Sequence, residues 1–205
     1  MLNHSNNIDR SFFERHPRIV ARELLDKLLI RRDARGKFRA GRIVETEAYP
    51  ANDPAAHTFN GKTARNAVIF GPAGHAYVYF TYGMHYCMNV SCEPEGKAGC
   101  VLLRALEPVE GLPAMAKSRG VELSSAPTQY ELRSLTSGPA RLCAALGITR
   151  ERDNGSDLLG AQSTLILADH GYKVRRIRTA TRIGISIAKE KKWRYFIDGN
   201  GFISK

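Results

Sequence analysis

The sequence predicts an α+β fold: a single domain with a curved, mainly antiparallel sheet and surrounding helices. Segments with strand-like alternation and segments with helical periodicity follow one another without the regular βαβ order of a parallel sheet. The 205 residues are enough for one sizeable core. No linker-like stretch divides the chain, so we expect one domain over residues 1–205. Its polar, Asn-rich residues 1–10 are expected to be flexible.

Composition and charge narrow the class of protein. Apolar residues make up 43% and charged residues 25%, which is ordinary for a globular domain. No apolar run approaches the length of a membrane span, and the start lacks the pattern of a signal peptide, so a cytoplasmic location is expected. The formal net charge of +11 favours a polyanionic partner over a membrane surface.

The first elements follow from periodicity. We expect a helix over residues 17–30, where apolar residues recur at helical spacing and Pro17 suits a first turn. A strand should follow over residues 38–48. Residues 50–75 are rich in Pro, Gly, Asn and Ala, and a loop-rich segment of this length is often functional. A short helix is expected inside it at residues 64–70.

The middle of the chain predicts three strands. Residues 75–81 and 86–92 alternate, and residues 99–106 are more continuously apolar. A helix is expected to begin near Pro108. Residues 120–135 are polar and are expected to form a mobile excursion.

The C-terminal third predicts a helix and further strands. The helix should run from residue 137 to residue 146, with Gly147 as its C-cap. Strands are expected near residues 163–168, 173–178 and 193–198.

Two glutamates stand inside the first expected strand. Glu45 and Glu47 are two residues apart, so a regular strand would put them on one face. Buried carboxylates are costly unless paired, and two like charges on one face raise each other's pKa. The residues alone therefore allow a buried salt bridge, a two-carboxylate hydrolase or a metal site. A bulge could turn one carboxylate away, and Arg42 or Arg104 could neutralise Glu45.

Arg104 lies within an apolar strand, where an arginine needs an anionic partner. Glu45 and Glu47 are the obvious candidates. A structural salt bridge and an active site explain this pairing equally well.

Tyrosines are concentrated between residues 77 and 86. Tyr77 and Tyr79 share a strand face, and Tyr77 and Tyr86 fit a core position. Tyr82 stands beside Gly83 in a hairpin-like turn, where a large ring projects outward. In a basic protein, an exposed aromatic ring at a turn indicates stacking on bases or insertion between them.

The cysteines and histidines do not have the spacing of a metal site. None of the four cysteines forms a Cys-x-x-Cys pair, and we expect them to be buried thiols. The histidines form no His-x-x-x-His pair either. No metal and no organic cofactor is expected.

The ordered motifs of the chain resemble one family, the alkyladenine DNA glycosylases, also called 3-methyladenine DNA glycosylases of the mammalian type. The resemblance covers residues 12–203, nearly the whole chain. It is carried by Arg42-Ile-Val-Glu-Thr-Glu-Ala-Tyr49, Ala56-His57, Gly61-Lys62-Thr63, Arg65-Asn66, Tyr77-Val-Tyr-Phe-Thr-Tyr-Gly-Met84, Cys87-Met-Asn89, Val101-Leu-Leu-Arg-Ala-Leu-Glu-Pro108, Ser137-Gly-Pro-Ala-Arg-Leu-Cys143 and Arg182-Ile-Gly-Ile185. The loop 50–56 departs from members that have a longer acidic loop, which leaves the entrance to the pocket open.

The resemblance implies a base-excision repair enzyme that hydrolyses the N-glycosidic bond of a damaged purine in duplex DNA and leaves an abasic site. Flipping of the base out of the helix is expected of the glycosylase class. The purines implied are 3-methyladenine, 7-methylguanine, hypoxanthine and ethenoadenine. Glu47 matches the general base that activates water, while Arg104 and the backbone of Ile183 match groups that hold that water. Glu45 is then expected to be structural.

The resemblance also implies how the flipped base is recognised. Tyr49, His57 and Tyr79 match the pocket that stacks on and hydrogen-bonds the base, and Asn89 matches the residue that disfavours guanine. Tyr82 matches the wedge that fills the vacated stack. Further contacts to DNA are expected from four residues, Lys62, Arg65, Met84 and Arg141.

Two rival functions are weaker. A basic RNA-binding module explains the charge and Tyr82 but not a glutamate paired with Arg104. A nuclease or a bifunctional lyase remains the third possibility, and a lyase needs an amine nucleophile with a lowered pKa. No lysine is singled out by its context, so we expect the base to be released with the strand intact. A monomer is expected, because one lesion needs one active site.

Overall fold

The computed structural model describes residues 8–171, 174 and 176–204. Within this part of the chain, eight strands form one sheet in which every pairing is antiparallel. The strands are β1 (Leu28–Arg32), β2 (Phe38–Pro50), β3 (Ala76–Thr81), β4 (His85–Ser91), β5 (Gly99–Glu110), β6 (Leu165–Ala168), β7 (Ile177–Ala180) and β8 (Arg194–Ile197). The predicted α+β fold with a mainly antiparallel sheet is confirmed.

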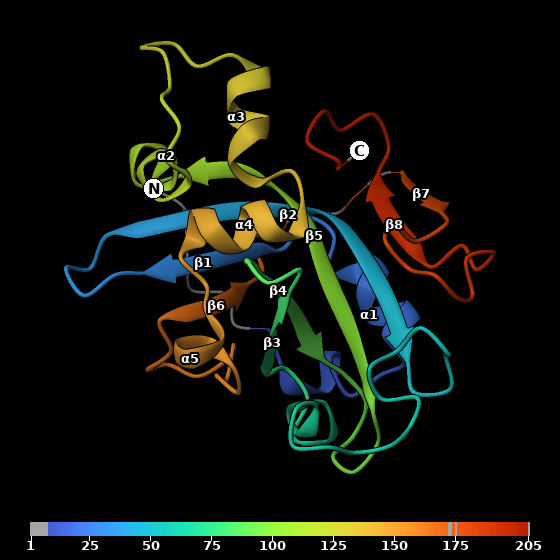
Figure 1. The fold of residues 1–205 in the computed structure, drawn as a ribbon. Coiled ribbons are helices and arrows are strands. Elements are labelled where there is room, and N and C mark those ends of the chain that lie inside the picture. The colour runs from blue at the N-terminus through green and yellow to red at the C-terminus, as the bar shows by residue number, and fades with distance from the viewer. Residues whose placement is uncertain (1–7, 172–173, 175, 205) are drawn as a thin grey trace.

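The long strands β2 and β5 form the spine of the sheet and curve together across the molecule (Figure 1). The order along the main path is β3-β4-β5-β2-β1-β6. One edge of β2 pairs with β5. The opposite edge pairs with β1 near the start of β2, and with β8 through Glu45, Thr46 and Glu47. Sequence segments from both ends of the chain therefore meet at the two glutamates.

Helices cover both faces of the sheet. Figure 1 shows α4 in front of the sheet and α1 behind it, and both pack on β5. The α-helices are α1 (Pro17–Glu23), α2 (Leu112–Arg119), α3 (Gln129–Thr136), α4 (Pro139–Leu146) and α5 (Arg150–Asp153), with short 3-10 helices at Arg10–Phe12 and Ala67–Phe70. The helix expected over 137–146 is confirmed as α4, and Gly147 is its left-handed C-cap.

The helix expected over residues 17–30 is wrong in its second half. The helix α1 ends at Glu23, and Asp26 adopts a left-handed backbone with φ of 75° that redirects the chain. The next apolar residues, 28–30, are buried within the sheet as β1, between β2 and β6. A short apolar run that is buried on both faces cannot be told from a helix by periodicity.

The helix expected near Pro108 begins four residues later. The strand β5 continues to Glu110, and a register shift opposite Gly41 accommodates Pro108, which cannot donate to a ladder. Gly111 then turns the chain into α2 with φ of 77°, in contact with the backbone of Phe38 where a Cβ would not fit.

The excursion expected over 120–135 is only partly right, because its second half forms α3. A capping box explains the start of this helix: the Thr128 hydroxyl accepts from the Glu131 N–H, and the Glu131 carboxylate accepts from the Thr128 N–H. Neither α3 nor the short helix α5 was predicted, although the Thr128–Glu131 spacing is a capping-box signal.

Two further predictions, for residues 1–10 and for residues 173–178, can be compared with the structure only in part. Residues 1–7 of the segment expected to be flexible lie outside the described residues, but Ile8 is buried in the core and Arg10 bonds the carbonyl of Ala73. Part of the strand expected near 173–178 also lies outside them, and β7 is found at Ile177–Ala180. Among the described residues, no helix is long and apolar enough to span a membrane.

Candidate active site on strands β2 and β5

Two β-bulges, one on β2 and one on β5, bring Glu45, Glu47 and Arg104 together. Along β2, Val44 is an extra residue between the pairs Ile43–Leu106 and Glu45–Ala105; along β5, Arg104 is an extra residue between Ala105 and Leu103. Such bulges re-aim side chains. The Arg104 guanidinium lies between the two carboxylates, with Nε 3.4 Å from Glu45 Oε1 and Nη1 3.2 Å from Glu47 Oε1. The predicted pairing of Arg104 is confirmed for both glutamates.

Glu47 is fully buried and its carboxylate accepts from three donors. Its Oε1 accepts from the N–H of Ile183 at 2.8 Å and contacts Arg104, while its Oε2 accepts from the hydroxyl of Tyr49 at 2.7 Å. Pairing of this kind offsets the cost of burying a charge. All three donors come from residues that the sequence analysis singled out.

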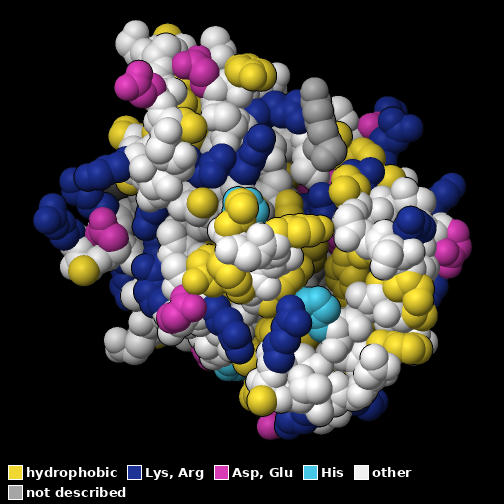
Figure 2. Space-filling model, in the orientation of Figure 1, with side chains coloured by type: hydrophobic (Ala, Val, Ile, Leu, Met, Phe, Trp, Pro, Cys, Tyr) yellow, Lys and Arg dark blue, Asp and Glu magenta, His cyan; other side chains and the backbone are white. Residues whose placement is uncertain are grey.

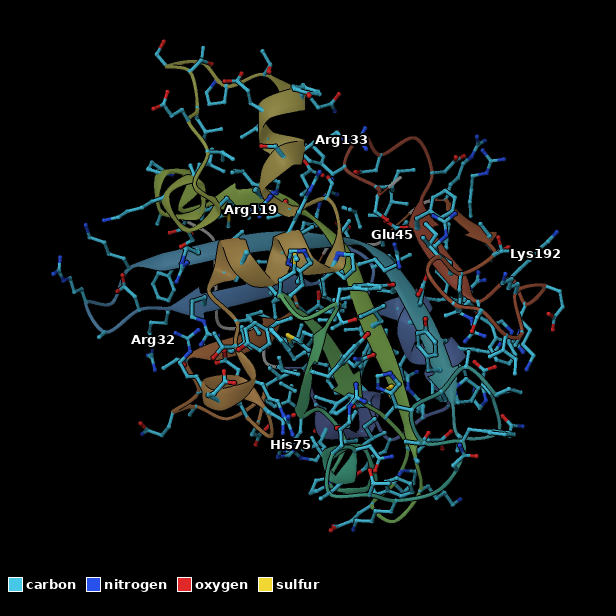
Figure 3. The ribbon with its side chains drawn as sticks, viewed as in Figure 1. Arg32, Glu45, His75, Arg119, Arg133 and Lys192 are labelled. Atoms are coloured by element: carbon cyan, nitrogen blue, oxygen red, sulfur yellow. The ribbon has the colours of Figure 1, made fainter. Side chains whose placement is uncertain are left out.

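Glu45 is fully buried and joins three segments of the chain. Its Oε1 accepts from Arg194 Nη1 at 2.8 Å, and its Oε2 accepts from the N–H of Ser204 at 2.6 Å. Figure 3 shows Glu45 where β2 meets β8. Arg42, the other partner considered for Glu45, instead pairs with Asp26 and Glu107. These contacts fit a structural role for Glu45.

Replacing Glu45 by glutamine is expected to lower the free energy of unfolding by about 2 kcal/mol, because Arg194 and Arg104 would lose a buried anionic partner while the amide keeps one acceptor. Thermal unfolding should then shift down by about 4–8 °C. The exposed pair of Arg15 and Glu23 provides the control, since Glu23→Gln should change stability very little. Equal melting temperatures for Glu45→Gln and the wild type would contradict the structural role.

A cavity of about 330 Å³ opens beside this cluster. Its walls include Tyr49, His57 and Tyr79, and Asn89, Arg104 and Ile183 also line it. Glu47 does not line the cavity itself, but its three donors do. Figure 2 shows an apolar-walled hollow on this face of the molecule. The donors that bind Glu47 therefore form part of the cavity wall.

The aromatic side chains of the cavity support one another. The rings of Tyr77 and Tyr79 stack with centroids 5.6 Å apart, and His57 packs edge-on against Tyr79 at 4.6 Å. Tyr77 is buried and its Oη lies 3.0 Å from His57 Nδ1. Burial, followed by the charge of Glu47 for Tyr49 and by Cys87 for Tyr79, raises the pKa of both tyrosines. Both therefore remain neutral hydroxyl donors at neutral pH.

Tyr82 stands at the mouth of the cavity on the β3–β4 turn. Tyr82 and Gly83 both have left-handed backbones, with φ of 51° and 66°, which matches a tight hairpin turn. The left-handed region is unfavourable for tyrosine but projects its ring outward, and Tyr82 is 80% exposed. An unfavourable backbone conformation that exposes a large aromatic ring indicates that the ring contacts a partner.

Three buried or half-buried residues beneath the cavity were missed by the sequence analysis. The Arg182 guanidinium pairs with Asp53 and lies between the rings of Tyr49 and Trp193, at 4.6 and 5.1 Å from their centroids. It also donates to the carbonyl of Ala48. This cluster attaches the loop after β2 to the segment that carries Ile183. The only signal for it was the position of Arg182 immediately before Ile183.

The four residues expected to contact DNA all lie around the cavity or near it on exposed positions. Met84 is 69% exposed on the same turn as Tyr82, and Lys62 and Arg65 are exposed on the loop beside His57. Arg141 is exposed on α4. Their contacts with DNA stay predictions.

No group of three or more His, Cys, Asp or Glu residues that could hold a metal occurs in the described part of the chain. All four cysteines are free and buried, as expected. The polar groups that the structure places at the site are carboxylate, guanidinium, phenol and backbone groups.

Comparison with known proteins identifies the family. The model of the methylpurine-DNA glycosylase family matches residues 11–201. The chain belongs to the methylpurine-DNA glycosylase family. It is 52% identical over 96% of its length to a protein of Koribacter versatilis named "Putative 3-methyladenine DNA glycosylase", of which 92% is covered. Relatives of the same name in Burkholderia lata and Carboxydothermus hydrogenoformans are 47% and 44% identical, over 96% and 97% of this chain and 90% and 98% of their own.

Membership of this glycosylase family makes the chain a DNA glycosylase, a hydrolase of DNA repair that acts on DNA. The predicted family is confirmed. The family match also accounts for the strong positive charge, since phosphate neutralisation dominates the affinity of proteins for DNA.

Proposed function

We propose that the chain excises damaged purines from duplex DNA by flipping the base into the cavity and attacking C1′ of its sugar with a water molecule activated by Glu47. One observation carries the proposal: a buried carboxylate, that of Glu47, is bound by Arg104 and the Ile183 N–H, and both of these residues line a cavity of about 330 Å³ walled by aromatic rings. The substrates proposed are 3-methyladenine, 7-methylguanine, hypoxanthine and ethenoadenine.

The reacting water is proposed to sit between Glu47, Arg104 and the carbonyl of Ile183. Arg104 Nη1 already lies 3.5 Å from that carbonyl and 3.2 Å from Glu47 Oε1, so the three groups surround one position. Catalytic hydrogen bonds in ligand-free proteins often tighten only with substrate. Glu47 takes the proton of the water, the oxygen bonds C1′, and the electrons of the glycosidic bond leave with the purine.

A single carboxylate suffices for this chemistry when the base is cationic. A purine methylated at N3 or N7 carries positive charge, which makes it a good leaving group without a general acid, whereas most glycoside hydrolases need two carboxylates. Stacking on Tyr49 and Tyr79 favours a cationic ring. Among the described residues, no lysine lines the cavity, which supports release of the base by hydrolysis with the strand left intact.

Selection among purines is proposed to depend on Asn89. Its side chain is buried in the cavity, and Cys100 Sγ lies 3.6 Å from its Oδ1. A side chain fixed in this way would clash with the exocyclic amine of guanine and so disfavour undamaged guanine.

Binding of the duplex is proposed to use Tyr82 as the wedge that fills the vacated stack, with Met84 beside it and Lys62, Arg65 and Arg141 on phosphates. The protein would act as a monomer and associate with the nucleoid through DNA.

His57 gives this proposal a pH dependence. Desolvation and, second, the charge of Arg65 lower the pKa of His57 from its ordinary value of 6.5, so the imidazole stays neutral to a lower pH than an ordinary histidine does. A charged His57 would repel a cationic purine. Single-turnover excision of 7-methylguanine between about pH 5 and pH 8 should therefore fall on an acid limb below pH 6.5. His57→Gln should lack that limb, and an identical profile in the variant would contradict the role.

The proposed function is tested with duplex oligonucleotides that each carry one of the four lesions. The wild type should release free base and leave an abasic, uncleaved strand. Release from none of the four would overturn the proposal. Strand cleavage without added alkali that copurifies with the protein would overturn the hydrolytic mechanism.

A further inference from the structure

A second cavity of about 480 Å³ lies next to the proposed base cavity, between α3, α4 and the C-terminal segment. The two cavities share Arg104 and Pro139, so they are neighbours on the same face. The volume is in the range of cavities that bind small ligands, about 300–1,000 Å³. Nothing in the glycosidic chemistry described above uses this second cavity.

The walls of the second cavity are basic. Arg133 and Arg141 line it from α3 and α4, and Arg104 lines it from β5, whereas no Asp or Glu belongs to its lining. Arg119 is close by: after burial, the charge of Arg141 is what lowers the pKa of Arg119. Figure 3 shows Arg119 and Arg133 near the base of α3, and Figure 2 shows dark blue side chains gathered above the hollow.

The arginines that line the second cavity differ in the groups that they already bind. Arg133 donates to the carbonyl of Ile203, and Arg104 is paired with the two glutamates. Arg141 is exposed and makes no ion pair within residues 8–171, 174 and 176–204. The nearest acid on α3, Glu131, is held by Ser124 and Thr128 in the capping box. The cavity therefore has a net positive charge and one uncommitted guanidinium, which suits a phosphate.

The rim of the cavity carries an aromatic platform. Tyr130 lines the cavity from the first turn of α3 and is 84% exposed, more than any other large hydrophobic side chain among the described residues. An exposed ring beside a basic cavity is the usual arrangement for stacking a base of single-stranded nucleic acid. Tyr130 and Tyr82 belong to different cavities, one on each side of Arg104 and Pro139.

We propose that this second cavity binds the nucleotide next to the flipped one on the damaged strand, with its phosphate on Arg141 and Arg133 and its base or sugar against Tyr130. The same strand is chosen because the cavities share a wall, so the backbone that leaves the first reaches the second within one nucleotide. Holding the neighbouring nucleotide would keep the damaged strand displaced while the purine is in the first cavity. This proposal rests on the proposed function, since it needs the damaged base to be flipped.

The test is a phosphate-by-phosphate binding scan. The probe is a short duplex with one 2′-fluoro-substituted ethenoadenosine, whose glycosidic bond resists hydrolysis, and with a single neutral methylphosphonate moved along either strand. For the wild type, one methylphosphonate beside the lesion on the damaged strand should weaken binding about tenfold. Arg141→Gln should weaken binding to the unmodified duplex to a similar degree and should no longer respond to that methylphosphonate. Arg35→Gln, an exposed charge change at the β1–β2 turn, is the control and should keep the full response.

The platform is tested separately. Tyr130→Ala should weaken binding of the same duplex about tenfold, and Tyr130→Phe should bind like the wild type, because stacking needs the ring and not the hydroxyl. Both residues are exposed, so melting temperatures should stay unchanged. Equal affinity of Tyr130→Ala and the wild type, or an unaltered methylphosphonate response in Arg141→Gln, would overturn the proposal. A wild type that neither prefers this lesion in binding nor releases ethenoadenine from the same duplex without the 2′-fluorine would instead overturn the proposed function.

Discussion

Glu47→Gln is expected to reduce the single-turnover rate of 3-methyladenine release by about 10³-fold to 10⁴-fold, while binding of the damaged duplex changes far less. The amide cannot take the proton of the attacking water. It also leaves Arg104 with one carboxylate instead of two, which disturbs the group proposed to hold that water. The measurement is free base released from a lesion-bearing duplex, with enzyme in excess.

The control for this variant is Glu107→Gln, which removes a carboxylate that pairs with Arg42 at a distance from the cavity. Glu107→Gln should release base at nearly the wild-type rate. If Glu47→Gln kept wild-type activity, Glu47 could not be the base. A parallel loss in both variants would point to a general loss of folded protein, which thermal unfolding detects.

Tyr82→Ala should weaken binding to a lesion in duplex DNA by about 10-fold to 100-fold, because the exposed ring is proposed to replace the stacking lost when the base leaves the helix. Binding to the same lesion in single-stranded DNA should change little, since no stack has to be filled there. The measurement is the dissociation constant for each substrate in matched buffer.

Tyr82→Phe keeps the ring and should behave like the wild type, which separates filling of the stack from any hydrogen bond of the hydroxyl. Replacement by alanine should not destabilise the fold, because the side chain is solvent-exposed. Equal losses on duplex and single-stranded DNA would show that Tyr82 is not a wedge.

Much of the site could be predicted because its residues lie in ordered motifs. Tyr49, His57, Tyr79, Asn89 and Arg104 all line one cavity, as the resemblance implied. The position of Arg104 inside an apolar strand also predicted its pairing with the glutamates, and the place of Tyr82 beside Gly83 in a turn predicted its outward position. These predictions depended on the local geometry of single strands and turns, which the order of residues in each segment indicates.

Other features depended on contacts between distant segments and could not be predicted. The sequence allows a bulge that turns one carboxylate away, but no local signal marks the bulges at Val44 and Arg104, which instead place both carboxylates on one guanidinium. The pairing of Arg182 with Asp53 joins residues far apart in the chain. The strand at residues 28–30 has no apolar–polar alternation, because its side chains are buried on both faces of the sheet, and such a short apolar run resembles a helix segment.

The most direct test of the account is a crystal structure of the protein bound to a duplex with a 2′-fluoro-substituted lesion nucleotide. We predict the purine in the first cavity, against Tyr49 and Tyr79, with Tyr82 in the vacated stack and a water molecule within hydrogen-bonding distance of Glu47, Arg104 and the Ile183 carbonyl. A bound complex with the damaged base still stacked in the helix, or with the base in the cavity and Glu47 out of reach of any water facing C1′, would contradict it.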